Sequence, residues 1–182
     1  MRKTAGLPWF VALAVAALTA GAAAPVHALG GEWDFRALLD GAPIGRHHFR
    51  VTEQGDERKV VTEANFAVKF LGITAYRYHH RATEQWRGDC LTALSATTDD
   101  GGTSTRVRSE HDGDALSVVS GTTAESLKGC VMSFAYWNPA IQSQTRLLNA
   151  QTGKFESVQV DRVGGGSIEV RGRPVVATRV RI

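Results

Sequence analysis

The sequence lacks the motifs that would indicate a particular enzymatic reaction. It has no glycine-rich dinucleotide fingerprint, no pair of catalytic carboxylates and no nucleophile elbow. The run Gly164-Gly165-Gly166 is not followed by the helix and lysine of a phosphate loop, so it indicates a turn. Cysteine is scarce, with two in 182 residues, and no cluster of Cys or Asp supports a metal site. We therefore expect no metal and no cofactor.

A strong charge of one sign is also missing once the N-terminus is set aside. Arg2 and Lys3 are the only charged residues among the first 28. Removing these two from the 21 Lys and Arg leaves 19, against 18 Asp and Glu. A net charge so close to zero does not favour an anionic partner, so we expect no nucleic-acid binding.

Long apolar runs are absent outside the first 28 residues, which resemble a cleavable export signal. Arg2 and Lys3 form a positive start, and Leu7–Ala20 has the length of a signal-peptide core. Val26-His27-Ala28 places small residues at both key positions of a cleavage site. The alternative is an uncleaved anchor helix, but Pro25 and many Ala and Gly residues weaken it. We predict a signal peptide over 1–28, then one β-rich domain over 29–182, periplasmic or secreted, with no transmembrane span after cleavage.

The expected compartment decides how the two cysteines are interpreted. In an oxidising exported compartment, the pair Cys90 and Cys130 predicts one disulfide. Closing a loop of about forty residues in this way would add roughly 4 kcal/mol to stability. The competing interpretation is a catalytic cysteine with a histidine partner, for which neither sequence neighbourhood offers support.

Alternation with a period of two runs through most of the remaining chain. It covers residues 33–40, 44–53, 60–70 and 74–86, and Gly-containing turn signals separate these stretches. Asp40-Gly41 is a typical hairpin signal. The pattern predicts an all-β antiparallel meander that forms a barrel or a strongly curved half-barrel. The terminal strand, Pro174–Ile182, favours a closed or nearly closed sheet because it needs a neighbour.

One stretch departs from the β pattern, and it predicts a short helix near residues 139–149. Asn138 is a good N-cap, and Pro139 stands at the favoured first helical position. Ala140–Leu148 contains no Gly or Pro and fits two to three amphipathic turns.

The strand over 74–86 is the first candidate site, because one of its faces mixes aromatic, histidine and glutamate side chains. If that face is buried, His80 and Glu84 need partners. Three interpretations stay open: a hydrogen-bonded network in a filled core, a ligand pocket, or an acid/base pair. The predicted ligand-binding residues on this strand are Tyr76, Tyr78, His80, Glu84 and Trp86.

The second candidate is the aromatic segment 133–139, which leads into the predicted helix. Tyr136 and Trp137 would lie at the mouth of a cavity if the segment forms an edge, or in the core if it is buried. A metal site is a further interpretation, because histidines occur as two adjacent pairs, His47-His48 and His79-His80. However, adjacent residues on a strand point to opposite faces, so neither pair chelates by itself. A site would need His47 and His80 to converge from two strands, and because no Cys or Asp cluster supports it, we predict no metal site.

Several segments resemble a known family. Leu39–Gly45, Val68–Ile73, Tyr76–Tyr78 and Phe134–Pro139, with Leu147–Gly153, are similar to the domain-of-unknown-function family 6134. The resemblance implies a short exported bacterial protein with a single domain. It implies no catalytic residues, because no activity is assigned to the family.

We therefore predict an exported, non-enzymatic protein that binds an apolar or amphipathic small molecule, with lipids in that class. The first alternative is an envelope interaction or scaffold protein with a filled core. The second is an enzyme that uses His80 with Glu84. A pocket of at least roughly 300 Å³ would separate the ligand-binding prediction from the first alternative.

Overall fold

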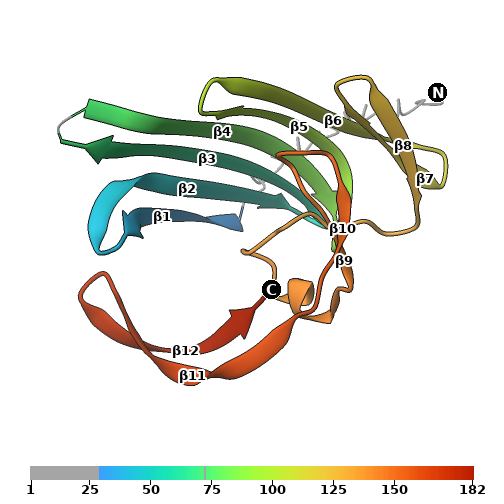
Figure 1. Cartoon of the computed structure of the whole chain (residues 1–182). Helices are drawn as coiled ribbons and strands as arrows, with labels where there is room; N and C mark the ends of the chain where they lie inside the picture. The colour runs from blue at the N-terminus through green and yellow to red at the C-terminus, as the bar shows by residue number, and fades with distance from the viewer. Residues whose placement is uncertain (1–28, 72) are drawn as a thin grey trace, which may run out of the picture.

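The computed structural model describes residues 29–71 and 73–182, and the predicted signal peptide lies outside these residues. Strands dominate the described chain, and eight of them form one antiparallel sheet in sequence order (Figure 1). These strands are β1 (Leu29–Leu39), β2 (Ala42–Gln54), β3 (Glu57–Phe70), β4 (Ile73–Arg87), β5 (Cys90–Asp100), β6 (Thr103–Asp112), β7 (Ala115–Ser120) and β8 (Thr123–Lys128). The predicted antiparallel meander is confirmed.

The chain after β8 makes smaller elements. A 3-10 turn, η1 (Pro139–Ser143), precedes the short pair β9 (Arg146–Leu148) and β10 (Phe155–Ser157). A long hairpin follows, made of β11 (Asp161–Val170) and β12 (Arg173–Arg181). Figure 1 shows this hairpin arching opposite the β1–β2 edge, with β9 and β10 crossing one end of the sheet. Among the described residues, no helix is long and apolar enough to cross a bilayer.

Turn chemistry explains why the meander folds where it does. Asp40 and Gly41 both have positive φ, at 49° and 80°, and they connect β1 to β2. Two successive positive φ values define the tight turn whose twist matches that of paired strands, and Asp-Gly suits it. The predicted hairpin is therefore confirmed.

The sheet is a curved, open half-barrel rather than a closed barrel. In the described chain, β1 and β8 are edge strands with one neighbour each, and no pairing joins them. Register shifts in the β1–β2, β3–β4 and β4–β5 pairs interrupt the ladders, and such bulges bend strands. The terminal strand β12 finds its neighbour in β11, so it does not close the main sheet.

The main core lies where residues 129–158 fold back onto the concave face of the sheet. Trp86, Leu91 and Leu116 from the sheet are almost completely buried there, together with Leu147 and Leu148 of β9. The predicted disulfide between Cys90 and Cys130 is present. Beside it, the amide of Leu91 donates to the carbonyl of Val131 at 2.8 Å, so the returning segment is joined to the start of β5.

The predicted helix is shorter than expected. The side chain of Asn138 caps it, accepting from the amide of Ala140 at 3.0 Å. The turn is of the 3-10 type and ends at Ser143, and residues 146–148 form β9 instead. The amphipathic spacing of Ile141, Leu147 and Leu148 predicts one helical face, whereas the two leucines are buried from a strand. Pairing with β10 on one side and the bridge from Leu148 to Ser133 on the other outweigh a weak local helical preference.

Candidate functional site

A pocket of about 370 Å³ opens on the concave face of the sheet. Strands β2, β3 and β4 form one wall, and two stretches of the returning segment, 133–137 and 149–151, form the other. The volume exceeds the roughly 300 Å³ expected of small-molecule sites. The lining residues are His47, Phe49, Thr62, Ala64, Phe66, Tyr78, His80, Ala82, Glu84, Ser133, Phe134, Ala135, Tyr136, Trp137, Asn149, Ala150 and Gln151.

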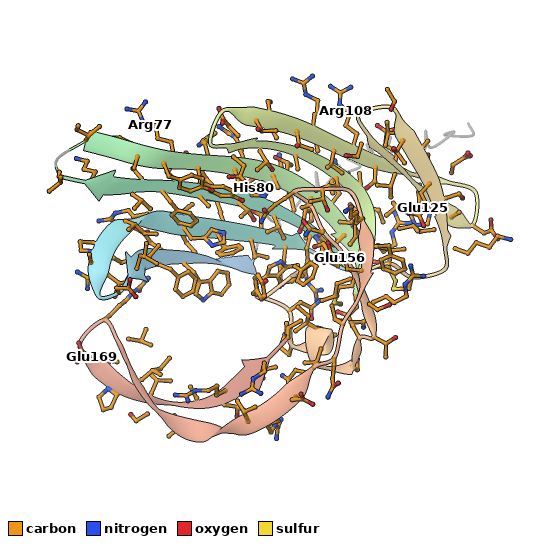
Figure 2. All side chains as sticks on the ribbon, in the orientation of Figure 1. Arg77, His80, Arg108, Glu125, Glu156 and Glu169 are labelled. Atoms are coloured by element: carbon orange, nitrogen blue, oxygen red, sulfur yellow. A yellow bond between two sulfur atoms is a disulfide. The ribbon has the colours of Figure 1, made fainter. Side chains whose placement is uncertain are left out.

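Strand β4 supplies two ionisable residues of the pocket, His80 and Glu84, through its alternation. His80, Ala82, Glu84 and Trp86 are buried, whereas the neighbouring Arg81, Gln85 and Arg87 are exposed and Thr83 is half-buried. In Figure 2, Arg77 and Arg108 project from the convex side, away from the pocket. The alternation thus places the mixed face of the strand inward, as the sequence predicts.

Glu84 is a buried carboxyl group, and in the described part of the chain its hydrogen-bond partners are both uncharged. It accepts two hydrogen bonds, one from Ser133 Oγ at 2.7 Å and one from Trp86 Nε1 at 3.1 Å. Burial raises the pKa of Glu84, and the two hydrogen bonds oppose that rise. Neither donor carries a charge, so the protein itself does not neutralise this carboxylate.

The two histidines of the pocket are held in the neutral form. His80 Nδ1 and Thr98 Oγ1 share a hydrogen bond of 2.9 Å. Burial, with smaller contributions from His47 and His79, lowers the pKa of His80 from 6.5 to about 4. Burial also lowers the pKa of His47. His47 Nε2 is buried and has no hydrogen-bond partner in the protein.

Aromatic rings form a continuous band across the inner face. Phe66 of β3 stacks on Tyr78 of β4, with ring centroids 5.3 Å apart, and Tyr78 lies 6.4 Å from the His80 ring. On β2, the rings of His47 and Phe49 lie 4.1 Å apart. Cross-strand pairing explains the band, because Phe66 is directly opposite Tyr78 in the ladder.

The returning segment covers this band with its own aromatic residues. Tyr136 is 63% exposed and lies at the rim, 6.2 Å from the ring of Phe134. Trp137 packs edge-on against Trp86 at 5.3 Å, and the Arg58 guanidinium lies over its ring. Trp137 Nε1 is buried without a hydrogen-bond partner. The segment is therefore part core and part pocket wall.

Five of the seven residues predicted to bind ligand line the pocket: Tyr78, His80, Glu84, Tyr136 and Trp137. The other two do not. Trp86 lies beneath the pocket at 1% exposure and positions Glu84 through its indole N–H. Tyr76, near the free end of β4, is exposed and donates a hydrogen bond to Asp100.

Sequence reasoning did not select several lining residues as site residues. His47, Phe49 and Phe66 all lie on faces that the alternation predicts to be inward, so a signal for them was available. Ser133 is part of the candidate segment 133–139, whereas Asn149 and Gln151 carry no comparable signal, because only the return of a distant segment brings them to the sheet.

His80 and Glu84, the two ionisable residues that β4 contributes to the lining, bond to different partners. They share none, so no hydrogen bond couples them in this structure. His47 and His80 both line the pocket. Across residues 29–71 and 73–182, no group of three or more His, Cys, Asp or Glu side chains is placed to hold a metal ion.

Comparisons with known proteins give one match. Neither the curated proteins nor the solved structures contain a match to the chain. The model of a domain of unknown function, DUF6134, matches residues 35–182, which includes every strand from β2 to β12 and every residue that lines the pocket. The chain therefore belongs to the DUF6134 family.

Proposed function

We propose that this protein is exported to the periplasm and binds an apolar or amphipathic small molecule, such as a lipid, without catalysing a reaction. The observation that carries the proposal is the pocket of about 370 Å³ between the sheet and the aromatic segment 133–137. A core that side chains filled completely would leave no such space. Concave sites with mostly apolar walls and a few convergent polar groups are typical of small-molecule binding.

Two buried polar atoms support a ligand with some polar character. His47 Nε2 and Trp137 Nε1 have no hydrogen-bond partner among residues 29–71 and 73–182, and both residues line the pocket. Leaving a buried donor or acceptor unsatisfied costs about 1–3 kcal/mol. A guest that bonds either atom would recover part of that cost, whereas a pure hydrocarbon would not.

Two observations support export. The first 28 residues have the charge and apolar pattern of a signal peptide. Cys90 and Cys130 form a disulfide, which persists in oxidising compartments and is rare in a reducing cytosol.

An interaction or scaffold role is the second candidate, and exposed apolar side chains favour it. On β1, Trp33 is 41% exposed and Phe35 53% exposed, and on β12 Val176 is 90% exposed. Exposed apolar patches mark contact surfaces. This role would use the sheet edge and the hairpin rather than the pocket.

The test is a fluorescence titration with N-phenyl-1-naphthylamine, an uncharged probe that becomes bright in apolar sites. We expect saturable binding to the wild type and at least a ten-fold loss for Ala82→Phe. Ala82 is buried, lines the pocket and lies between His80 and Glu84 on the inner face, so a phenyl ring there occupies the space.

Ala75→Phe is the matched control, because Ala75 is exposed on the same strand and lies outside the pocket lining. Should Ala82→Phe not fold, Ala64→Phe on β3 fills the same pocket from the neighbouring strand. Absence of saturable binding to the wild type would remove the ligand-binding proposal. Equal binding by the filled and control variants would place the probe elsewhere.

A further inference from the structure

We propose that the pocket holds an amphipathic organic cation, with a protonated amine at Glu84 and the apolar part against the aromatic side chains. This inference rests on the proposed function and names its ligand class. It starts from the one carboxyl group in the pocket lining and from the absence of Lys and Arg among the lining residues.

The geometry at Glu84 leaves room for a further donor. A carboxylate offers about four lone-pair sites, and Ser133 and Trp86 occupy one on each oxygen. These two donors hold the carboxylate in a fixed orientation without adding charge. An ammonium group carries three N–H donors, so it can bond the remaining sites and supply the missing charge.

Nothing else in the lining compensates for a charge on Glu84. The 17 lining residues include no Lys, Arg or Asp. Burial keeps the pKa values of His47 and His80 low, so both rings are neutral near pH 7 and do not repel a cation. Burial raises the pKa of Glu84, because it penalises the charged form of the carboxyl group. A buried carboxyl group is normally either protonated or paired with a cation, and an ammonium group brought by a ligand would supply that cation.

The aromatic residues suit the rest of such a ligand. Rings present negatively polarised faces that attract cations, by about 0.5–2 kcal/mol each where water is excluded. They also offer a large apolar surface to a hydrocarbon tail. The aromatic residues that line the pocket are Phe49, Phe66, Tyr78, Phe134, Tyr136 and Trp137.

The same arrangement disfavours anionic lipids. A carboxylate or phosphate at the polar end of the pocket would meet Glu84 and find no guanidinium or ammonium group in the lining. Like charges in a poorly solvated site repel strongly. A fatty acid therefore fits the walls of the pocket but not its polar end.

The test compares three competitors that share one tail: dodecylamine, dodecanol and dodecanoate, each displacing N-phenyl-1-naphthylamine at pH 7 and below its aggregation concentration. We expect dodecylamine to bind at least ten-fold more tightly than dodecanoate and several-fold more tightly than dodecanol. In Glu84→Gln, the preference for the amine over the alcohol should fall to within two-fold while the probe still binds.

Glu110→Gln is the matched control, because Glu110 is exposed on β6 and is not among the lining residues. It should keep the wild-type ranking. If Glu84→Gln does not fold, the ranking of the three competitors on the wild type decides alone. Dodecanol or dodecanoate binding as tightly as the amine, or an unchanged ranking in Glu84→Gln, overturns the cation assignment.

The outcomes separate this inference from the proposed function. If neither the probe nor any competitor binds, the proposed function falls, and the ligand class falls with it. If the probe binds but the amine has no advantage, ligand binding stands and only the assignment of a cation is wrong.

Discussion

At the scale of single residues, burial penalises charge on two titratable groups of the pocket. His80 is 6% exposed, and among the described residues its side chain hydrogen-bonds with the Thr98 hydroxyl. Glu84 is buried to the same degree and accepts from two neutral donors. Because burial penalises charge on both residues, each one makes the stability of the protein depend on pH.

The lowered pKa of His80 predicts a loss of stability in mild acid. Its pKa is about 4 in the folded protein, below the 6.5 of an unfolded chain. The unfolded state therefore takes up a proton first as the pH falls from about 6.5 to 4, and the folded state loses up to about 3 kcal/mol relative to it. Above pH 6.5 this effect is absent.

We expect His80→Asn, which keeps a polar atom near the Thr98 hydroxyl but does not titrate, to flatten this dependence. The measurement is the free energy of urea unfolding at pH 7.5 and pH 4.5 for both proteins. The raised pKa of Glu84 acts in the opposite direction, but it is common to both proteins. Parallel curves for the two proteins would contradict the buried, neutral state of His80.

At the scale of elements, local sequence signals predict the strands of the sheet. They do not predict the opposite wall of the pocket, which residues 133–137 and 149–151 form. Alternation and turn residues locate β1 to β4 because each residue's face is set by its neighbours in sequence. The stretch 146–148 forms β9 because residues 155–157 pair with it on one side and the segment around Ser133 bonds to it on the other. Its periodicity predicts a helix, and a local signal carries no information about a non-local partner.

The residues of the site also fall into those that local alternation predicts and those that depend on the returning segment. The inward positions of Tyr78, His80 and Glu84 follow from the alternation of one strand. Tyr76 shares that parity but lies outside the pocket lining, because the returning segment meets the strand further along. Alternation predicts which face of the strand a residue occupies, but it does not predict which part of the strand the returning segment contacts.

The disulfide stabilises the attachment of the returning segment, residues 129–158, to the sheet. It joins the start of β5 to the segment that lines the pocket, across 40 positions of sequence. We expect the double variant Cys90→Ser, Cys130→Ser to lose about 4 kcal/mol of unfolding free energy, because the unfolded chain regains the entropy of an open loop.

The measurement is urea unfolding of the double variant beside the wild type, with and without reductant. The double variant should be insensitive to reductant, whereas the wild type should fall to its level. A wild type that reductant leaves unchanged would show that the bond adds nothing to stability.

At the scale of the whole molecule, the chain offers two apolar regions that compete as binding surfaces. One is the pocket between the sheet and the returning segment. The other consists of the exposed apolar residues of β1 and of the hairpin β11–β12, which arches opposite β1 in Figure 1. A two-stranded hairpin is marginally stable by itself, so its exposed valines suit a contact surface. Only the location of a bound molecule separates the two roles.

The central claim is that an amphipathic amine binds in the pocket between the sheet and the returning segment. Backbone amide chemical-shift mapping during titration with dodecylamine tests it most directly, because it locates the ligand without altering the protein. The account predicts saturable shifts at the inner positions of β2, β3 and β4 and at residues 133–137, with the amides around Glu84 among the largest. Shifts confined to β1 and the β11–β12 hairpin, with the pocket residues unmoved, would contradict it.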